Sequence, residues 1–518
     1  MKRLLYIVYG LLLFGSCNSV LDVQPENSVT YKNFFQNEED VHSVYVQMYS
    51  KLRDVYYDFY TMQPQDKIGL RYDAKNTYAE EYEEELKHLS VPAFKALLIS
   101  WGAYYDAIFQ ANLILDNIYR AHLSKDREDL YVGHAYFVKG LMYYEIARRW
   151  GNAPITIDSE DDKPLARSEA SVVLDTAIAN ALRAYNMLAK YDESVDVNGK
   201  IISKYYAHKG AATALLANIY AWKGGVFDDM EAYKEAEKYC TLVIEKEVGI
   251  YDLEETPEKL CLNKRMSCES VFELLNRNED FGTGSTTGRY HTGINYHIGE
   301  NYGLGGYPLN PNAVVGNNKM YSLYLLKNET VKEIWGEGDL RRQAYFWNFD
   351  EMCEESTDIT GGYAYPYFWR TPTIDAYWSE MINVDGNRMF WRLADIYLLR
   401  AEARCRGGLA GAEDDLNVVR DRAYGVKDQD TDHHYKPSEG DLQMAIFRER
   451  EKELFFDGER YFDIIRNGYW RLPEMISSTY ASLTDADVKE GALYMPIPDS
   501  EMQRNNKMRR NPYWLARW

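Results

Sequence analysis

The sequence predicts a mainly α-helical protein built from helix hairpins and carrying a large loop-rich insert. Three observations support this prediction. Apolar residues recur at steps of three and four in the N-terminal half, two segments have the composition of helix hairpins, and residues 250–385 show little periodicity. A chain of 518 residues is also long enough to bury a large core.

The chain begins with a short apolar run, residues 4–14, which follows two basic residues. This pattern is typical of a secretory signal, and the run is shorter than the roughly 20 residues that a membrane-spanning helix needs. Cys17 follows two small residues directly after the run. We therefore predict a signal peptide over 1–16, lipid on Cys17 and a tether over 17–30, with an ordinary signal peptide and an incidental cysteine as the alternative.

The N-terminal half contains five segments with helical spacing of apolar residues. The third of them is followed by Gly151 and Pro154, which are helix stop signals. The predicted helices are Glu38 to Tyr57, Val91 to Tyr119, Leu130 to Arg149, Ser171 to Ala189 and Ser203 to Lys223.

Two helix hairpins are predicted, the first from residues 210–225 and 233–246, the second from 391–408 and 410–423. In each pair the first helix is rich in small residues and ends at glycines, and the second helix has regularly spaced Ala and aliphatic residues. Small residues let helices approach closely. The pairs resemble tetratricopeptide repeats, although no regular period of about 34 residues spans the chain.

The remaining middle part, residues 250–385, is predicted to be a ligand-binding insert. We expect it to interrupt a helical scaffold formed by 31–249 and 386–518, the whole being a single domain over 31–518. Long loops in compact proteins are usually functional or disordered, and disordered segments are poor in aromatic residues. The insert has two stretches rich in Gly, Tyr or Trp, which are 282–312 and 361–378.

Composition argues against several classes of protein. The formal charge of −21 makes nucleic-acid binding unlikely, because phosphate contacts need a basic surface. Zinc-protease, P-loop and nucleophile-elbow motifs are absent from the sequence. Five cysteines follow Cys17 without a CxxC pair, and we expect unpaired thiols, although Cys261 and Cys268 are close enough to bridge. We expect the adjacent His433 and His434 to be solvated, and we predict no metal site and no cofactor.

The densest group of charges lies in residues 445–468, where Arg, Glu and Asp alternate with aromatic residues. A catalytic role is conceivable. A structural role is favoured, because aromatic residues at these steps bury a helix face and Arg–carboxylate pairs hold neighbouring helices together.

Aromatic composition indicates the kind of ligand. The chain has 45 Tyr against 18 Phe and 11 Trp, an excess that favours rings with one edge in water. Such rings suit a ligand that is polar but has flat apolar faces, such as a sugar. The alternative is that tyrosine fills boundary positions around helices.

Motifs that occur together in one protein family are found in the segments 16–41, 101–118, 338–347, 392–403, 449–468 and 493–514. In this order they resemble the SusD/RagB family of outer-membrane lipoproteins of the Bacteroidetes. The resemblance runs from end to end of the chain, with modest departures at Phe14 before the cysteine and at Asn506-Lys507 near the end.

The resemblance implies an α-helical SusD-like fold of tetratricopeptide-like hairpins and a location at the outer membrane facing the cell exterior. It implies a binding protein, not an enzyme, that passes oligosaccharides, or peptides in some members, to a SusC-like TonB-dependent transporter. A peptide-binding RagB-like protein, a glycoside hydrolase and a scaffold that binds only proteins remain alternatives.

Candidate ligand contacts come from aromatic residues in irregular segments and the polar residues near them, with packing as the alternative role for each one. They are Asp66, Arg71, Tyr72, Tyr78, Tyr290, Tyr296, Tyr363, Tyr365, Trp369 and Trp378.

Overall fold

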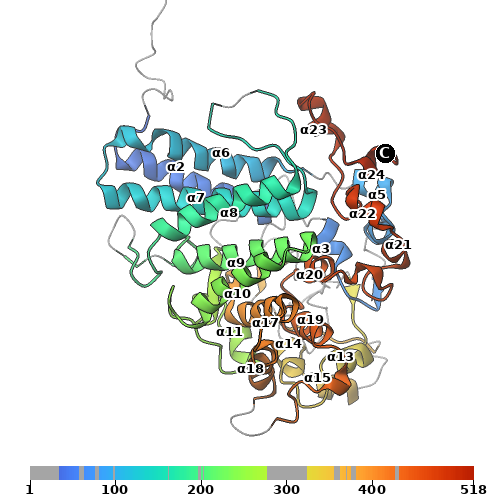
Figure 1. The fold of residues 1–518 in the computed structure, drawn as a ribbon. Coiled ribbons are helices and arrows are strands. Elements are labelled where there is room, and N and C mark those ends of the chain that lie inside the picture. Colours follow the sequence, from blue (N-terminus) through green and yellow to red (C-terminus); the bar gives the residue numbers. More distant parts are fainter. Residues whose placement is uncertain are drawn as a thin grey trace, which may run out of the picture.

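Figure 1 shows a computed structural model of the chain, in which helices predominate, as predicted. The sheets in the described part have two strands each. No helix there is both long and apolar enough to cross a bilayer. The structure describes residues 34–57, 64–75, 81–96, 100–160, 163–195, 200–201, 203–276, 324–354, 362–368, 370, 372–374, 381–384, 386–425 and 431–518.

The long helices form a continuous stack (Figure 1), in which each helix packs on the next in chain order. Their apolar faces bury the main hydrophobic core. In this order the helices are α2 (Glu38–Tyr57), α6 (Gly102–Asn117), α7 (Lys125–Trp150), α8 (Ala170–Met187), α9 (Lys209–Phe227), α10 (Met230–Ile244), α17 (Leu393–Gly407) and α18 (Ala412–Tyr424).

The two predicted hairpins are confirmed as the pairs α9–α10 and α17–α18. Helix α10 also packs on α17, so the hairpins are neighbours although the insert separates them in sequence. Small residues make the close packing possible. A Cβ atom on Gly225 of α9 would lie 2.4 Å from the backbone oxygen of Arg466, and one on Gly140 of α7 would lie 3.2 Å from that of Ala177 in α8.

Four of the five predicted helices have different bounds in the structure. Helix α7 begins five residues earlier than predicted, α8 shifts by one or two residues at each end, and the other two differ more. The predicted helix from Val91 to Tyr119 is interrupted: α5 (Val91–Ala96) ends early, and α6 begins where the Ser100 hydroxyl accepts a hydrogen bond from the Gly102 N–H. The helix predicted from Ser203 begins at Lys209 instead. His208 has an extended backbone and its ring nitrogen accepts a hydrogen bond from the Ala211 N–H, which caps α9.

Most of the shorter helices lie on one side of the stack, at the right in Figure 1. The last of them lies against the N-terminal half, where the Trp514 ring is 4.9 Å from that of Phe94 in α5. The shorter helices are α3 (Pro64–Ile68), α4 (Glu81–Glu85), α11 (Pro257–Leu262), α13 (Asn328–Ile334), α14 (Arg341–Tyr345), α15 (Phe349–Glu354), α19 (Leu442–Glu453), α20 (Arg460–Arg466), α21 (Ser478–Ala481), α22 (Asp485–Lys489), α23 (Asp499–Arg504) and α24 (Pro512–Leu515).

Antiparallel strand pairs tie the predicted insert to itself and to the scaffold. Strands β2 (Ser270–Leu274) and β6 (Arg388–Arg392) pair from Ser270 opposite Arg392 to Leu274 opposite Arg388, so the chain enters and leaves the intervening segment at one place. The other pairs are β1 (Ala74–Lys75) with β3 (Tyr324–Leu325) and β4 (Pro372–Ile374) with β5 (Met381–Val384).

The charged residues of 445–468 have the structural role that the sequence favoured. The Glu453 carboxylate, at the end of α19, is paired with Arg341 of α14, Arg392 of β6 and Arg422 of α18, and all four residues are buried. Burial alone would raise the pKa of Glu453, but the three guanidinium groups outweigh it and hold the pKa below its usual range. One carboxylate on α19 therefore connects this helix to three other elements. We call Glu453 and the three arginines the Glu453 cluster.

A second buried group of ion pairs joins α17, α19 and α20. Arg450 of α19 contacts Asp395 at 2.8 Å and Asp463 at 3.0 Å. Arg466 contacts the same Asp463 and also Glu402 of α17, both at 2.6 Å. These charges are paired with one another away from water, so they serve the packing of the helices.

The five cysteines after Cys17 all lie in described residues and are free thiols, among them Cys261 and Cys268. Cys261 is buried, and its thiol points to the Ala344 carbonyl oxygen at 3.6 Å. Burial raises the pKa of the Cys261 thiol, which makes it a small apolar core group.

Candidate functional site

Three segments that are far apart in sequence meet beside a second, smaller core. The Asp73 N–H donates to the Leu325 carbonyl at 2.8 Å, and the Ala364 N–H donates to the Leu326 carbonyl at 2.8 Å. The segment at 324–328 therefore lies between 70–75 and 362–368. This brings together two of the aromatic regions from which the candidate ligand contacts were chosen.

Residues 362–368 alternate between half-buried and buried. Tyr363, Tyr365 and Tyr367 are half-buried, and Ala364 and Phe368 lie in the core. Burial with a period of two is typical of extended chain, in which every second side chain shares a face about 7 Å apart. We therefore describe Tyr363, Tyr365 and Tyr367 as the tyrosine row.

Sequence reasoning found two members of the row and missed Tyr367. The Tyr367 ring lies 4.9 Å from the Trp347 ring in a T-shaped arrangement, and the Arg370 guanidinium lies 4.3 Å from its centroid. Arg370 in turn donates to Glu258 at 2.7 Å. The alternating pattern YAYPYF (363–368) is the signal in the sequence that could have identified Tyr367.

The smaller core fixes the backbone of the tyrosine row. The Tyr367 N–H donates to the Tyr345 carbonyl at 2.6 Å, and the Trp347 N–H donates to the Tyr365 carbonyl at 2.9 Å. Phe368 packs its ring on Phe456 at 5.1 Å. Rings on a fixed backbone lose little conformational entropy when they bind a ligand. The buried members of this core are Leu70, Cys261, Tyr324, Leu326, Val331, Ile334, Trp335, Ala344, Tyr345, Phe346, Phe349, Ala364, Phe368, Phe455 and Phe456.

Tyr72 lies at the edge of the same core. Its ring is 4.5 Å from the Tyr324 ring, and the Lys87 ammonium lies 3.9 Å from its centroid. Burial, with a smaller effect of Glu84, raises the pKa of Tyr72 to about 12. Burial, with the nearby Arg460, lowers the pKa of Lys87 to about 8. Tyr72 is therefore a neutral, partly exposed ring with a positive group on it.

The two charged candidates are engaged with other protein groups. Arg71 contacts Glu451 at 3.3 Å and the exposed Glu333 at 3.5 Å. Asp66 contacts Arg149 of α7 at 3.1 Å, and burial raises the pKa of Asp66 although Arg149 opposes this. The structure thus places Asp66 against the helical stack and Arg71 near the smaller core.

The other predicted site residues lie outside the described residues, and their roles stay predictions. They are the predicted lipid attachment site Cys17 and the candidates Tyr78, Tyr290, Tyr296, Trp369 and Trp378.

A helical stack that carries an aromatic-rich insert defines a class of binding proteins, and comparison with known proteins identifies the family. A model described as "SusD family" matches residues 268–514, and a second, described as "Starch-binding associating with outer membrane", matches residues 20–221. The SusD-like protein P25 of Formosa agariphila is 24% identical over 551 residues, covering 96% of each chain. The protein belongs to the SusD/RagB family.

Solved structures have the same fold. A SusD homolog from Bacteroides thetaiotaomicron has a TM-score of 0.73 and 19% identity, covering 93% of this chain and 99% of its own. The surface glycan-binding protein A from Bacteroides thetaiotaomicron, solved in complex with laminarihexaose, has a TM-score of 0.70 and 17% identity, covering 92% of this chain and all of its own (100%). At these identities the likeness establishes the fold and leaves the ligand open.

Proposed function

We propose that the protein binds oligosaccharides at the cell surface and delivers them to a SusC-like TonB-dependent transporter in the outer membrane. Lipid on Cys17 would hold it there. The observation that carries the proposal is the tyrosine row, three half-buried rings at alternate positions on a backbone fixed by a packed core. Membership of the SusD/RagB family supports the same class of function.

The chemistry of the row suits sugars. A pyranose ring has a flat apolar face for stacking and hydroxyl groups at its rim, and a tyrosine offers both an apolar ring and a hydrogen-bonding hydroxyl. Several such contacts along an extended glycan add up. The complex of the surface glycan-binding protein A with laminarihexaose supports a carbohydrate as the ligand class.

Binding without hydrolysis agrees with the charges near the row. A glycoside hydrolase needs two carboxyl groups on either side of the bond that breaks, one of them protonated. Arg370 contacts both the Tyr367 ring and Glu258, and its guanidinium forms an ion pair with the Glu258 carboxylate. Both oxygens of this carboxylate are thus already engaged by a protein group.

Affinity electrophoresis of residues 18–518 tests the ligand class, with gels that contain starch, laminarin, xylan, pectin, mannan, fructan or mucin glycans. We expect retardation by at least one polysaccharide. Changing Tyr363, Tyr365 or Tyr367 to Ala should each weaken it about tenfold, the loss of one stacking contact of about 1.4 kcal/mol. Tyr119→Ala is the matched control, because Tyr119 is exposed on the helical stack.

Lack of retardation by every polysaccharide would count against the proposal. Oligopeptides that co-purify with a complex of this protein and its transporter would then favour the RagB-like alternative. Release of reducing ends that one carboxylate substitution abolishes would favour a hydrolase. Co-purification with a β-barrel transporter after detergent extraction tests the partner.

A further inference from the structure

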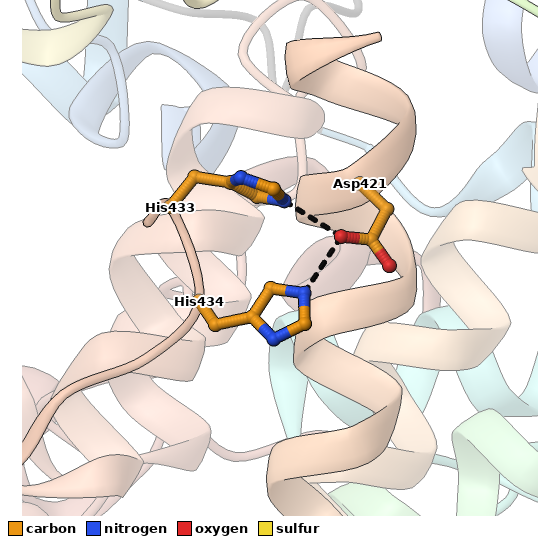
Figure 2. Close-up of side chains that lie close together, drawn as sticks. All are labelled: Asp421, His433 and His434. Atoms are coloured by element: carbon orange, nitrogen blue, oxygen red, sulfur yellow. Dashed lines mark hydrogen bonds and ion pairs between the residues drawn. The ribbon is translucent and has the colours of Figure 1, made fainter. Parts of the chain in front are cut away.

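The turn after α18 brings two histidines onto one carboxylate, as Figure 2 shows. The Nε2 atoms of His433 and His434 lie 2.6 and 2.7 Å from the same Oδ1 atom of Asp421. His433 is nearly buried, with 6% of its side chain exposed, whereas His434 is 28% and Asp421 41% exposed. The sequence suggested that both histidines are solvated, and the structure differs. With Asp421 they form a cluster that opens to water on one side.

One face of α18 positions this cluster. Asn417 accepts a hydrogen bond from the Tyr435 N–H at 3.0 Å, and Arg420 donates to the His433 carbonyl at 3.2 Å. Tyr424 stacks on the His433 ring at 5.0 Å. Asn417, Arg420 and Tyr424 share a helix face with Asp421, since residues three and four apart lie above one another. Both the backbone and one ring of the dipeptide are thus fixed before any ligand binds.

We propose that Asp421, His433 and His434 bind one divalent transition-metal ion, with Zn²⁺ as the reference ion. The candidate ligand atoms all lie within 4.8 Å of one another. Zn²⁺ at about 2.0–2.1 Å from each ligand in a tetrahedron would separate them by about 3.3 Å, so each Nε2 needs to withdraw by about 0.6 Å. Two imidazoles and one carboxylate suit Zn²⁺, Co²⁺ or Ni²⁺, whereas Ca²⁺ and Mg²⁺ take oxygen ligands.

The surrounding charges allow a cation to bind. The guanidinium that contacts the turn, Arg420, is itself neutralised by Glu449 and Glu439, both at 3.0 Å. The Nε2 atoms that face Asp421 are the atoms that a metal would need, so binding requires each imidazole to present an unprotonated Nε2 and to carry its ring proton on Nδ1. Water can fill the fourth position on the exposed side of His434 and Asp421.

Bound metal would connect the C-terminal turn of α18 to residues 431–436. This end of α18 also contacts the insert, because the Leu340 N–H donates to the Ala423 carbonyl at 2.9 Å. An ion that binds only the folded chain stabilises it by mass action, so the unfolding midpoint rises with the concentration of the ion. The site would thus be structural and separate from the tyrosine row.

Titration calorimetry of the full mature chain, first treated with EDTA, tests the proposal with ZnCl₂ as the probe. We expect one ion per chain and a rise in the thermal unfolding midpoint when Zn²⁺ is added. His434→Ala and Asp421→Asn should each weaken binding at least tenfold. His122→Asn is the matched control, because His122 is exposed and has a positive φ that Asn tolerates.

Cobalt provides a second readout that needs no variant. Co²⁺ bound to the unmodified chain should give visible d–d absorption bands that Zn²⁺ displaces. Absence of Zn²⁺ binding, or binding that both site variants leave unchanged, would overturn the proposal. Circular dichroism shows whether His434→Ala folds. If it does not, Asp421→Asn is the deciding variant, because this substitution keeps the size and one oxygen of the side chain. Loss of its cobalt bands would support the proposal, and unchanged bands would overturn it.

Discussion

The Glu453 cluster and the tyrosine row both border the smaller core at Tyr345 but use their side chains in different ways. The cluster buries one carboxylate and three guanidinium groups that pair across α14, β6, α18 and α19. The row holds three partly exposed tyrosine rings on a fixed backbone. Buried charge thus sets the geometry of the scaffold, whereas the insert presents aromatic rings at its surface. Substitutions should therefore affect stability in the first region and binding in the second.

The largest effect is expected from Glu453→Ala. The substitution leaves Arg341, Arg392 and Arg422 short of a buried partner, and breaking a buried ion pair typically costs about 3–5 kcal/mol. Urea unfolding measures the free energy. Asp485→Asn is the control, since Asp485 forms an exposed pair with Arg471, and it should cost less than about 1 kcal/mol. Equal losses of unfolding free energy in the two variants would show that the buried Glu453 cluster is worth no more than an exposed ion pair.

Acid should also lower the stability of the scaffold, and the loss per protonated carboxylate should be similar to the loss in Glu453→Ala. Neighbouring guanidinium groups overcome the effect of burial and lower the pKa of Glu402, Glu449 and Glu459 to about 2 each. A lowered folded-state pKa adds stability above the unfolded-state pKa of about 4.3, and this is lost as pH falls from there toward 2.

Unfolding measured between pH 5 and pH 2 tests this prediction. Each of the three groups contributes about 3 kcal/mol, since one pKa unit corresponds to about 1.4 kcal/mol. Glu459→Gln should be less stable than the unmodified chain at pH 6 and lose less stability on acidification. An unchanged pH profile in this variant would show that Glu459 is not linked to acid unfolding.

Close helix packing predicts an intermediate effect. In Gly225→Ala the new methyl group would lie 2.4 Å from the Arg466 backbone oxygen, and overpacking of this kind costs about 1–3 kcal/mol. Gly336→Ala is the matched control, because nothing lies within 4 Å of the added Cβ. Thermal unfolding of the two variants should differ clearly, and coinciding midpoints would mean that the helices can move apart freely.

The smallest effect on stability is expected in the tyrosine row. Tyr363→Ala removes a half-buried ring, and we expect the free energy of unfolding to change by less than about 1 kcal/mol. The same variant should lose glycan retardation about tenfold, as proposed above. A large loss of stability would mean that Tyr363 packs instead of binding, and would remove it from the site.

Local pattern predicted the scaffold better than the insert. Helix α2 has the bounds that apolar spacing predicted. The prediction went wrong where one side chain competes for a backbone N–H, as Ser100 and His208 do. Such competition changes where a helix begins without changing the apolar period.

The candidate site was harder to predict, because its parts come from distant segments. The alternation in YAYPYF was visible in the sequence, but only the pairing of 362–368 with residues 326 and 345 shows which face lies outward. Similarly, His433 and His434 look solvated until α18 places Asp421 against them. Sequence spacing cannot reveal a partner that reaches the group through a tertiary contact.

The pairing of β2 with β6 bears on how such a protein can change over time. Leu274 and Arg388 are partners across the ladder, so the two ends of the segment between them are already held together. The entropy of closing a loop grows only with the logarithm of its length, and doubling it costs about 0.6 kcal/mol. Evolution can therefore lengthen or shorten this segment at little cost, as long as the parts that pack on the scaffold, such as Arg341, are kept.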